Sequence, residues 1–308
     1  MKHVVSVSLG SDRRNHSVET EILGTGFKIE RIGTNGDLEK AIEMINDLDG
    51  QVDAFGMGGI DLFITVGKKR YMLRDAKRIA DAAKITPIVD GTGLKNTLER
   101  STVHYLCEQG LFNFAGKEVL LVCGVDRFGM AEALVEMGAR VTFGDLIFGL
   151  NLPLPIQSLR TLSAIGRILG PIVSEMPFKY LYPTGAKQEE VLSDRYQKYY
   201  DDNEIIAGDF HYIRRYLPHR ICGKTILTNT VTPEDIDLLA ERGAVRLITT
   251  TPEFRGRSFG TNVMEAVLVV LLGKSLSEIQ EQDYQEILER VQFKPRIIDL
   301  KQIRSAIS

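Results

Sequence analysis

Short apolar segments alternate with amphipathic segments along most of the chain. In the first third, five segments rich in Val, Ile and Phe are typical of strands; they are Val4–Ser8, Phe27–Ile32, Val52–Phe55, Leu62–Val66 and Thr86–Val89. Helical spacing separates them at Leu38–Leu48 and Asp75–Ala83, and a longer helix is predicted over Leu94–Gln109. This alternation predicts an N-terminal α/β substrate domain over residues 1–113.

The second part of the chain repeats the alternation with more strongly apolar strands. Glu118–Cys123 is a continuous apolar strand, Met130–Met137 is helical, and Arg140–Phe143 is the next strand, which together form a βαβ unit. Further strands are predicted at Ile205–Ala207, Thr225–Thr228 and Val245–Thr249, and an apolar helix at Asn262–Leu272. We predict an α/β fold with a Rossmann-like, doubly wound parallel sheet over residues 114–275. Residues 276–308 are predicted to be helical and to return to the N-terminal domain.

Composition narrows the classes of partner. The chain has 308 residues and a net charge of -3, with Lys and Arg scattered, which excludes a nucleic-acid footprint. The three cysteines, Cys107, Cys123 and Cys222, show no metal-ligand spacing and suit a cytoplasmic protein without disulfides or bound metal. The longest apolar run, Ala266–Leu272, is too short to span a membrane. The apolar face of Ile156–Leu169 favours core packing or a homodimer interface.

A candidate nucleotide-binding turn follows the strand Glu118–Cys123. A dinucleotide site needs a strand, a tight glycine turn and a helix whose N-terminal amides face the diphosphate. Gly124 permits the sharp turn, and Gly129 lets helix and strand approach closely. The candidate cofactor contacts in this turn are Gly124, Asp126, Arg127, Phe128 and Gly129. The alternative is a connection that binds no dinucleotide.

Two aspartates bear on the ligand that this turn would take. Asp145 ends the next strand, where a carboxylate can accept hydrogen bonds from the adenosine ribose; this favours NAD, with NADP as the alternative. Asp126 stands where the pattern has its middle glycine, and there a carboxylate repels a diphosphate unless it turns aside. We expect Asp126 to cap the helix and Arg127 to give its positive charge to the ligand. The alternative for Asp145 is a solvated strand end.

Candidate catalytic residues follow strands of the first domain. Asp90 and Lys95 lie between a predicted strand and a helix, and a lysine beside a carboxylate can move a proton to or from an alcohol oxygen. Asn96 is a candidate substrate contact next to this lysine, and Asp61, after a glycine-rich turn, is a candidate to bind substrate hydroxyls. The alternatives are a helix start with a surface lysine, and a tight turn between two strands.

Two loops of the second domain carry the remaining candidates. Asp209 and His211 follow the strand Ile205–Ala207; His211 is the second choice for proton transfer, and the alternative is a helix N-cap at Asp209. The loop after the last parallel strand has hydroxyls, arginines and glycines suited to a hydroxylated acid. Thr250 is assigned to the cofactor, and the loop's candidate substrate contacts are Arg255, Arg257, Ser258, Thr261 and Asn262. The alternative is an ordinary exposed loop.

Several segments together resemble a known family. They are the residues from Arg100 onward, Val125–Glu132, Ala207–Arg215, Thr249–Glu253 and Gly260–Asn262. With these, the chain resembles the shikimate/quinate 5-dehydrogenase superfamily, and in particular a prokaryotic quinate 5-dehydrogenase-like group. The resemblance implies a substrate domain, a Rossmann domain and a last helix returning to the first domain. The superfamily's lysine after Asn-Val-Thr and its Gly-x-Asn-Thr-Asp turn have their nearest match in Val89–Thr97, where the order differs.

The residues and the resemblance lead to one principal hypothesis and two alternatives. The principal hypothesis is an NAD(P)-dependent oxidoreductase acting on a hydroxylated carboxylic acid such as quinate or shikimate. One alternative is a nucleotide-sensing or ligand-binding protein without redox turnover. The other is a transferase that uses the same turn for S-adenosylmethionine, because one scaffold hosts many chemistries.

Overall fold

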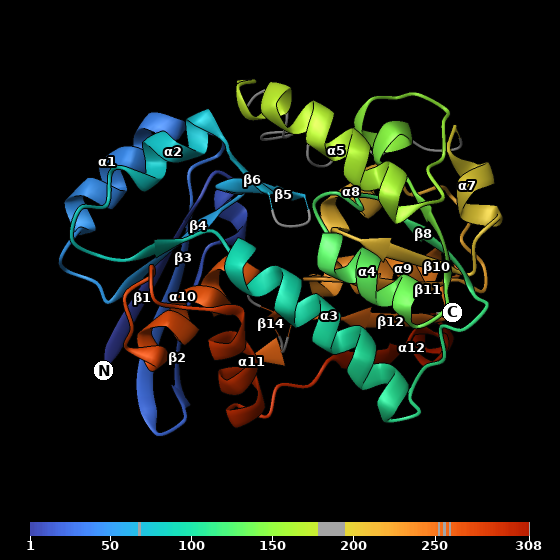
Figure 1. Ribbon diagram of the computed structural model, residues 1–308. Helices are drawn as coiled ribbons and strands as arrows, with labels where there is room; N and C mark the ends of the chain where they lie inside the picture. Colours follow the sequence, from blue (N-terminus) through green and yellow to red (C-terminus); the bar gives the residue numbers. More distant parts are fainter. Residues whose placement is uncertain (67–68, 178–194, 252, 255–256, 259, 308) are drawn as a thin grey trace. The chain divides into compact units, whose positions relative to one another are not determined.

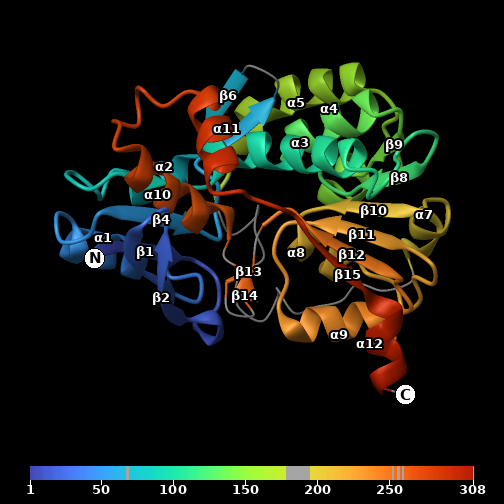
Figure 2. The same ribbon diagram turned by 90° about the horizontal axis from the view of Figure 1, so that it is seen from below.

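A computed structural model describes residues 1–66, 69–177, 195–251, 253–254, 257–258 and 260–307. The chain divides into two compact units (Figures 1 and 2). The first unit contains Met1–Thr97, Ile168–Gln188 and Gly260–Phe293, and the second contains Leu98–Arg167, Glu189–Phe259 and Lys294–Ser308. The chain therefore passes between the units several times, whereas the sequence predicted consecutive domains. Of the C-terminal segment, the first unit takes only the part up to Phe293.

The first unit is built on a five-stranded sheet of order β2-β3-β1-β4-β7. Its strands are β1 (Lys2–Ser8), β2 (His16–Ile22), β3 (Thr25–Gly33), β4 (Ala54–Gly58) and β7 (Ile88–Val89). All neighbours are parallel except β2, which forms an antiparallel hairpin with β3. The predicted strand at Leu62–Val66 is instead β5 (Phe63–Val66), which pairs with β6 (Lys69–Met72) in a separate hairpin.

Helices cover both faces of this sheet. One face, with Val5, Val7, Phe55 and Met57, packs into a core with α1 (Leu38–Leu48) and α2 (Arg74–Ala80). The opposite face contacts α10 (Thr261–Leu272), which packs in turn against α11 (Glu281–Arg290). Because β1, β3, β4 and β7 are parallel, their carboxyl ends meet at one edge, where ligands bind in open α/β sheets.

The helix α3 (Thr92–Glu108) follows β7 and contributes residues to both units. The second unit has a six-stranded sheet of order β15-β12-β11-β10-β8-β9. Its strands are β8 (Glu118–Leu121), β9 (Arg140–Phe143), β10 (Ile205–Gly208), β11 (Thr225–Thr228), β12 (Arg246–Thr249) and β15 (Arg296–Asp299). All are parallel except β15. From β8 the chain goes outward to β9 and then returns to the other side of β8 at β10, which places the change of direction between β8 and β10.

Helices also cover both faces of the second sheet, so the predicted doubly wound α/β class is confirmed. Side chains of α3, α4 (Phe128–Glu136) and α5 (Leu159–Ser174) pack on one face. The other face is covered by α7 (Gln197–Asp201), α8 (Phe210–Arg215), α9 (Pro233–Glu241) and α12 (Leu300–Ile307). A short hairpin, β13 (Glu253–Phe254) and β14 (Arg257–Ser258), follows β12.

Among the helices that the structure describes, none is long and apolar enough to cross a membrane. Within the described residues, no group of three or more His, Cys, Asp or Glu side chains is placed to hold a metal ion.

Candidate functional site

The predicted strand–turn–helix unit is present in the second unit. The turn Val122–Arg127 connects β8 to α4, which begins at Phe128. Gly124 has no space for a side chain, because a Cβ there would lie 2.7 Å from the Phe143 ring and 2.9 Å from Leu162. The glycine is therefore required by packing between the turn, β9 and α5.

The Asp145 carboxylate follows β9 and is bound to this turn. Its two oxygens accept hydrogen bonds from the backbone amides of Gly124, at 2.9 Å, and Val125, at 2.8 Å. The amide of Arg127 donates to the Cys123 carbonyl at 3.1 Å. Burial raises the pKa of the Asp145 carboxyl to about 6. Asp145 thus lies where the ribose-binding acid was predicted. However, it also accepts hydrogen bonds from the backbone amides of Gly124 and Val125, which the nucleotide hypothesis had assigned to a phosphate group.

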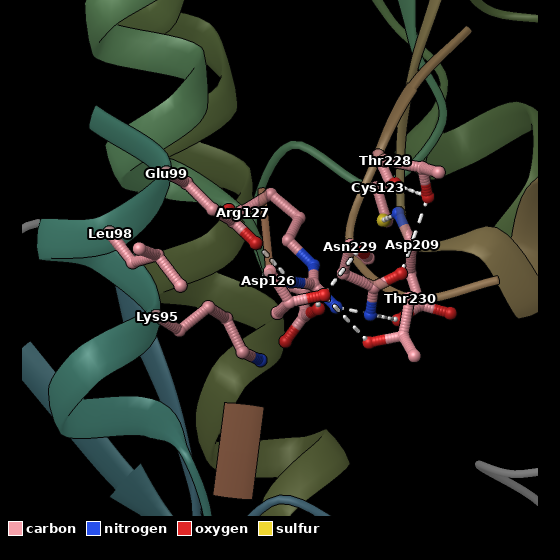
Figure 3. Close-up of polar contacts among 12 residues, drawn as sticks. Lys95, Leu98, Glu99, Cys123, Asp126, Arg127, Asp209, Thr228, Asn229 and Thr230 are labelled. Carbon is pink, nitrogen blue, oxygen red and sulfur yellow. Dashed lines mark hydrogen bonds and ion pairs between the residues drawn. The ribbon is translucent and has the colours of Figure 1, made fainter. Parts of the chain in front are cut away.

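Arg127 points inward, contrary to the expectation that it offers its charge to a ligand. Its guanidinium is buried and pairs with Glu99 of α3, with Asp209 at 2.5 Å and with the neighbouring Asp126 at 3.1 Å (Figure 3). Burial opposes the charge of the guanidinium, but the three carboxylates outweigh it and hold the pKa of Arg127 well above its usual value. Asp126 faces this arginine, and α4 has no side-chain cap.

Asp209 joins this ion pair to the end of β10. One carboxylate oxygen accepts from the backbone amide of His211, which makes Asp209 the N-cap of α8. The other oxygen accepts from Arg127 and, at 2.9 Å, from Asn229 (Figure 3). The capping alternative for Asp209 is therefore the one observed, and His211 is exposed in the first turn of α8. Glu99 and Asn229 were missed by sequence reasoning because neither belongs to the glycine-turn pattern.

Thr250 is fully buried just beyond β12. Its backbone amide donates to the Thr228 carbonyl at 2.8 Å, and its hydroxyl has no hydrogen-bond partner within the described part of the chain. Such an orphaned polar atom at the carboxyl edge of a parallel sheet is a candidate ligand contact. The assignment of Thr250 to a cofactor stays a prediction.

In the first unit, Lys95 pairs with Asp61 rather than with Asp90. Lys95 is only 5% exposed, and its Nζ lies 3.2 Å from the Asp61 carboxylate. Asp90 instead accepts hydrogen bonds from the Leu62 amide and from the amide and hydroxyl of Thr92, at 3.0 and 2.5 Å. The predicted lysine–carboxylate pair therefore exists with a different acid, and Asp90 ties the β4–β5 connection at Leu62 to the turn between β7 and α3 at Thr92. Asn96 follows Lys95 in α3.

The remaining candidate substrate contacts lie in the loop after β12 and in the first turn of α10. The side-chain amide of Asn262 donates to Ser6 Oγ of β1 at 2.7 Å, and Thr261 is buried. Gly56 and Gly58 of β4 make room for Asn262, because a Cβ on either would lie 3.0–3.2 Å from its amide nitrogen. Arg255 lies outside the described residues. For Arg257 and Ser258, the structure describes only their backbone, in β14.

A buried acid, Glu265 of α10, supports the turn that precedes Lys95. Its carboxyl accepts a hydrogen bond from the Tyr284 hydroxyl of α11 at 2.6 Å and one from the backbone amide of Gly91. Gly93 must lack a side chain, since a Cβ there would overlap Glu265. Burial and the nearby charge of Asp90 raise the pKa of Glu265 to about 7. Glu265 of α10 therefore holds the turn between β7 and α3 through its hydrogen bond with the Gly91 amide.

Comparison with known protein families identifies the larger part of the chain. Residues 93–300 match a family described as "Domain of unknown function (DUF8754)". The chain belongs to this family. Residues 3–90 match a second family, "Domain of unknown function (DUF8753)". Lys95 lies in the first match and Asp61 in the second, so the ion pair joins the two matched segments.

Comparisons with curated proteins and solved structures add little. No curated protein matches the chain. A glutamate dehydrogenase from Thermus thermophilus is 12% identical, with 94% of this chain and 74% of that chain covered and a TM-score of 0.43. An L-tryptophan dehydrogenase from Nostoc punctiforme is 11% identical (95% and 79% covered, TM-score 0.37). A periplasmic ribose ABC transporter from Conexibacter woesei is 10% identical (99% and 94% covered, TM-score 0.39). Similarities this distant do not indicate a function.

The buried Glu265 predicts a pH dependence of stability. Its pKa is about 7 in the folded protein against an ordinary value of 4.5, so between these pH values the unfolded chain loses a proton that the folded protein retains. The free energy of unfolding should therefore fall by about 3 kcal/mol as the pH rises through this window, and level off above it. The Glu265→Gln variant should lack this part of the fall.

Urea denaturation at pH 4.5 and pH 7.5, followed by circular dichroism, measures this difference. Glu286→Gln, an exposed site on α11, is the matched control and should behave like the unmodified protein. The raised pKa of Asp145 also lowers the free energy of unfolding as the pH rises. This contribution is the same in the unmodified protein and in both variants, so it cancels in the comparison. Equal pH dependence in Glu265→Gln and the unmodified protein would contradict the prediction.

Proposed function

We propose that the protein is an NAD(P)-linked oxidoreductase acting on a hydroxylated carboxylic acid. The observation that carries the proposal is the ion pair between the buried Lys95 and the half-buried Asp61 at the carboxyl edge of the first sheet. Oxidation of an alcohol releases a hydride and a proton, and the proton needs an acceptor near the oxygen. A lysine held beside a carboxylate and shielded from water can accept it, because small changes in its surroundings shift its pKa.

Hydroxyl and amide groups of the same unit suit such a substrate. Ser6 and Asn262 are linked to each other beside the glycines of β4, whose missing side chains make room for Asn262. In this proposal Lys95 moves the proton at the substrate's hydroxyl oxygen, Asp61 orients the ammonium group, and Asn262 and Ser6 hydrogen-bond the remaining polar groups. A bound nicotinamide dinucleotide would supply the hydride acceptor.

The second unit supports a dinucleotide in part. Its doubly wound sheet, its glycine turn after β8 and the acid after β9 are in the positions that such a cofactor requires. Asp145 is only partly buried, and a carboxylate has about four lone-pair sites, of which the turn uses two. Ribose hydroxyls can therefore donate to Asp145 while it remains bound to the turn.

A direct assay tests the proposal. Purified full-length protein is incubated with quinate, shikimate or other hydroxy acids and with NAD or NADP, and absorbance at the reduced nicotinamide band is followed. Turnover with one acid supports the proposal. Absence of turnover with every acid, together with no dinucleotide binding by calorimetry, would overturn it.

A second candidate function is the binding of an adenosine-containing ligand without hydride transfer. The hydrogen bonds and ion pairs already made by the residues of the glycine turn favour it. Asp145 takes the amides of Gly124 and Val125, and the guanidinium of Arg127 is enclosed by carboxylates. These contacts favour an adenosine ligand held through its ribose and lacking a diphosphate, such as S-adenosylmethionine. Thermal shifts with NAD, NADP and S-adenosylmethionine separate the candidates, because only the ligand that binds the folded protein raises its melting temperature.

A further inference from the structure

One face of the first sheet changes from apolar to polar toward its carboxyl edge. In β3, Phe27 and Ile29 are buried on this face, and Arg31 is the next residue in the same phase. The parallel register pairs Ile29 with Val4 and Arg31 with Ser6 of β1. An arginine therefore occupies a strand position where the alternation calls for a hydrophobic side chain.

The partners of Arg31 are all neutral. Its guanidinium donates to Ser8 Oγ at 3.0 Å, to the Ser11 carbonyl at 3.0 Å and to Asn15 Oδ1 at 3.5 Å. Within the described ranges, no carboxylate lies within ion-pair distance of it. The neighbouring acid Glu30 projects from the other face, where it pairs with His3 and Lys28. A half-buried cation compensated only by neutral groups is unusual, since buried charges are normally paired.

The loop around Arg31 is shaped closely to the guanidinium. A Cβ on Gly10 would lie 2.8 Å from Arg31 Nη2, and one on Gly33 would lie 2.5 Å from the Ser11 carbonyl oxygen. Burial and, to a smaller extent, the positive charge of Arg14 together lower the pKa of Arg31 to about 10. A guanidinium has five N–H donors, of which the contacts above use three. Two N–H groups of Arg31 are thus left to donate to a ligand, and the positive charge of its guanidinium is not balanced by a carboxylate of the described residues.

We propose that Arg31, together with Ser8, binds the carboxylate of a small-molecule ligand. Planar carboxylates accept two parallel hydrogen bonds from a guanidinium, and partial desolvation strengthens that contact. The proposal rests on the proposed function where it takes this group to be the acid of the hydroxylated substrate. It assigns to β3 a role that sequence reasoning gave to Arg255 and Arg257. It places the acid group at the ends of β1 and β3, in the same unit that holds Lys95 and Asp61.

Calorimetric titration of the full-length protein tests this site without any dinucleotide. The probes are quinate, malate and inorganic phosphate at constant ionic strength. Quinate or malate should bind saturably, and Arg31→Gln should weaken binding by about 10- to 100-fold, as expected for the loss of hydrogen bonds to a charged group. Arg78→Gln removes an exposed charge of the same unit, paired with Glu39, and should bind like the unmodified protein.

Two further variants protect the test against misfolding. Arg31→Lys keeps the charge but loses the two-pronged geometry, and Gly10→Ala keeps Arg31 but places a methyl group against its Nη2 atom. Both should weaken carboxylate binding by about tenfold or more while melting cooperatively. Unchanged affinity in folded Arg31→Lys and Gly10→Ala, or binding of phosphate with no binding of either acid, would overturn the proposal.

The experiments distinguish failure of the Arg31 carboxylate site from failure of the proposed oxidoreductase function. Carboxylate binding that depends on Arg31, without hydride transfer to any dinucleotide, would support this site and remove the oxidoreductase. Hydride transfer whose KM for the acid is unaffected by Arg31→Lys would retain the oxidoreductase and remove this site.

Discussion

The Arg127→Met variant is expected to lose about 3–5 kcal/mol of unfolding free energy at neutral pH, the usual cost of removing one member of a buried ion pair. Glu99 is 1% exposed, and its carboxylate would lose the guanidinium that faces it. Asp209 would lose the same group at 2.5 Å. Methionine fills a similar volume, so the loss reports charge rather than a cavity. Urea denaturation followed by circular dichroism measures it.

Arg100→Met is the matched control for this prediction. Arg100 also pairs with a carboxylate, Glu132, within the second unit, but both side chains are 30–41% exposed. Exposed pairs contribute about 0–1 kcal/mol, so this variant should unfold nearly like the unmodified protein. Protonation of the carboxylates at lower pH should narrow the difference between Arg127→Met and the unmodified protein. Equal stabilities of the Arg127 and Arg100 variants would contradict the role given to the buried cluster.

The βαβ unit of the second sheet could be predicted from the sequence because its signals are local. Val119–Cys123 is a continuous apolar run, Gly124 stands where packing leaves no room for a side chain, and Arg140–Phe143 matches β9 residue for residue. In contrast, β2 was missed, because His16–Ile22 is mostly polar and is held by its hairpin with β3. Pairing with a neighbouring strand outweighed the weak intrinsic preference of these residues.

The partners of the candidate site residues could not be predicted from sequence spacing. Asp90 lies five residues before Lys95, but its oxygens are occupied by the Leu62 amide and by Thr92. Asp61 is far from Lys95 in sequence and is brought to it by the packing of the first unit. Arg127 was expected to give its positive charge to a ligand, yet carboxylates from α3 and from the end of β10 draw it inward. These pairings are tertiary, so they leave no periodic signal.

Arg31 is the exception among the residues that were missed. A charged residue in the buried phase of an otherwise apolar strand is visible in the sequence, since Phe27, Ile29 and Arg31 share one face. What the sequence could not show is the neutrality of its surroundings, which depends on the loop from Ser8 to Asn15 folding over the guanidinium.

Replacement of Lys95 is expected to have the largest effect on turnover. Under the proposed function, Lys95→Met should lower kcat by about 10²- to 10⁴-fold, the range contributed by general acid–base groups. Lys95→Arg keeps the positive charge, but a guanidinium does not give up a proton near neutral pH, so this variant should be nearly as slow. Lys84→Met, at an exposed lysine of the same unit, is the control and should leave kcat unchanged.

Asp61→Asn distinguishes proton transfer from simple charge placement. The amide keeps the shape of the side chain but removes the negative charge 3.2 Å from the ammonium group, which should lower the pKa of Lys95 and move the acidic limb of the kcat/KM profile to lower pH. Steady-state rates between pH 6 and 10 measure this shift, and thermal melting shows that each variant is folded. Full turnover in folded Lys95→Arg, together with an unchanged pH profile in Asp61→Asn, would contradict proton transfer by Lys95. Lys95 would then be a structural cation, because a group that transfers no proton does not set the pH dependence of the rate.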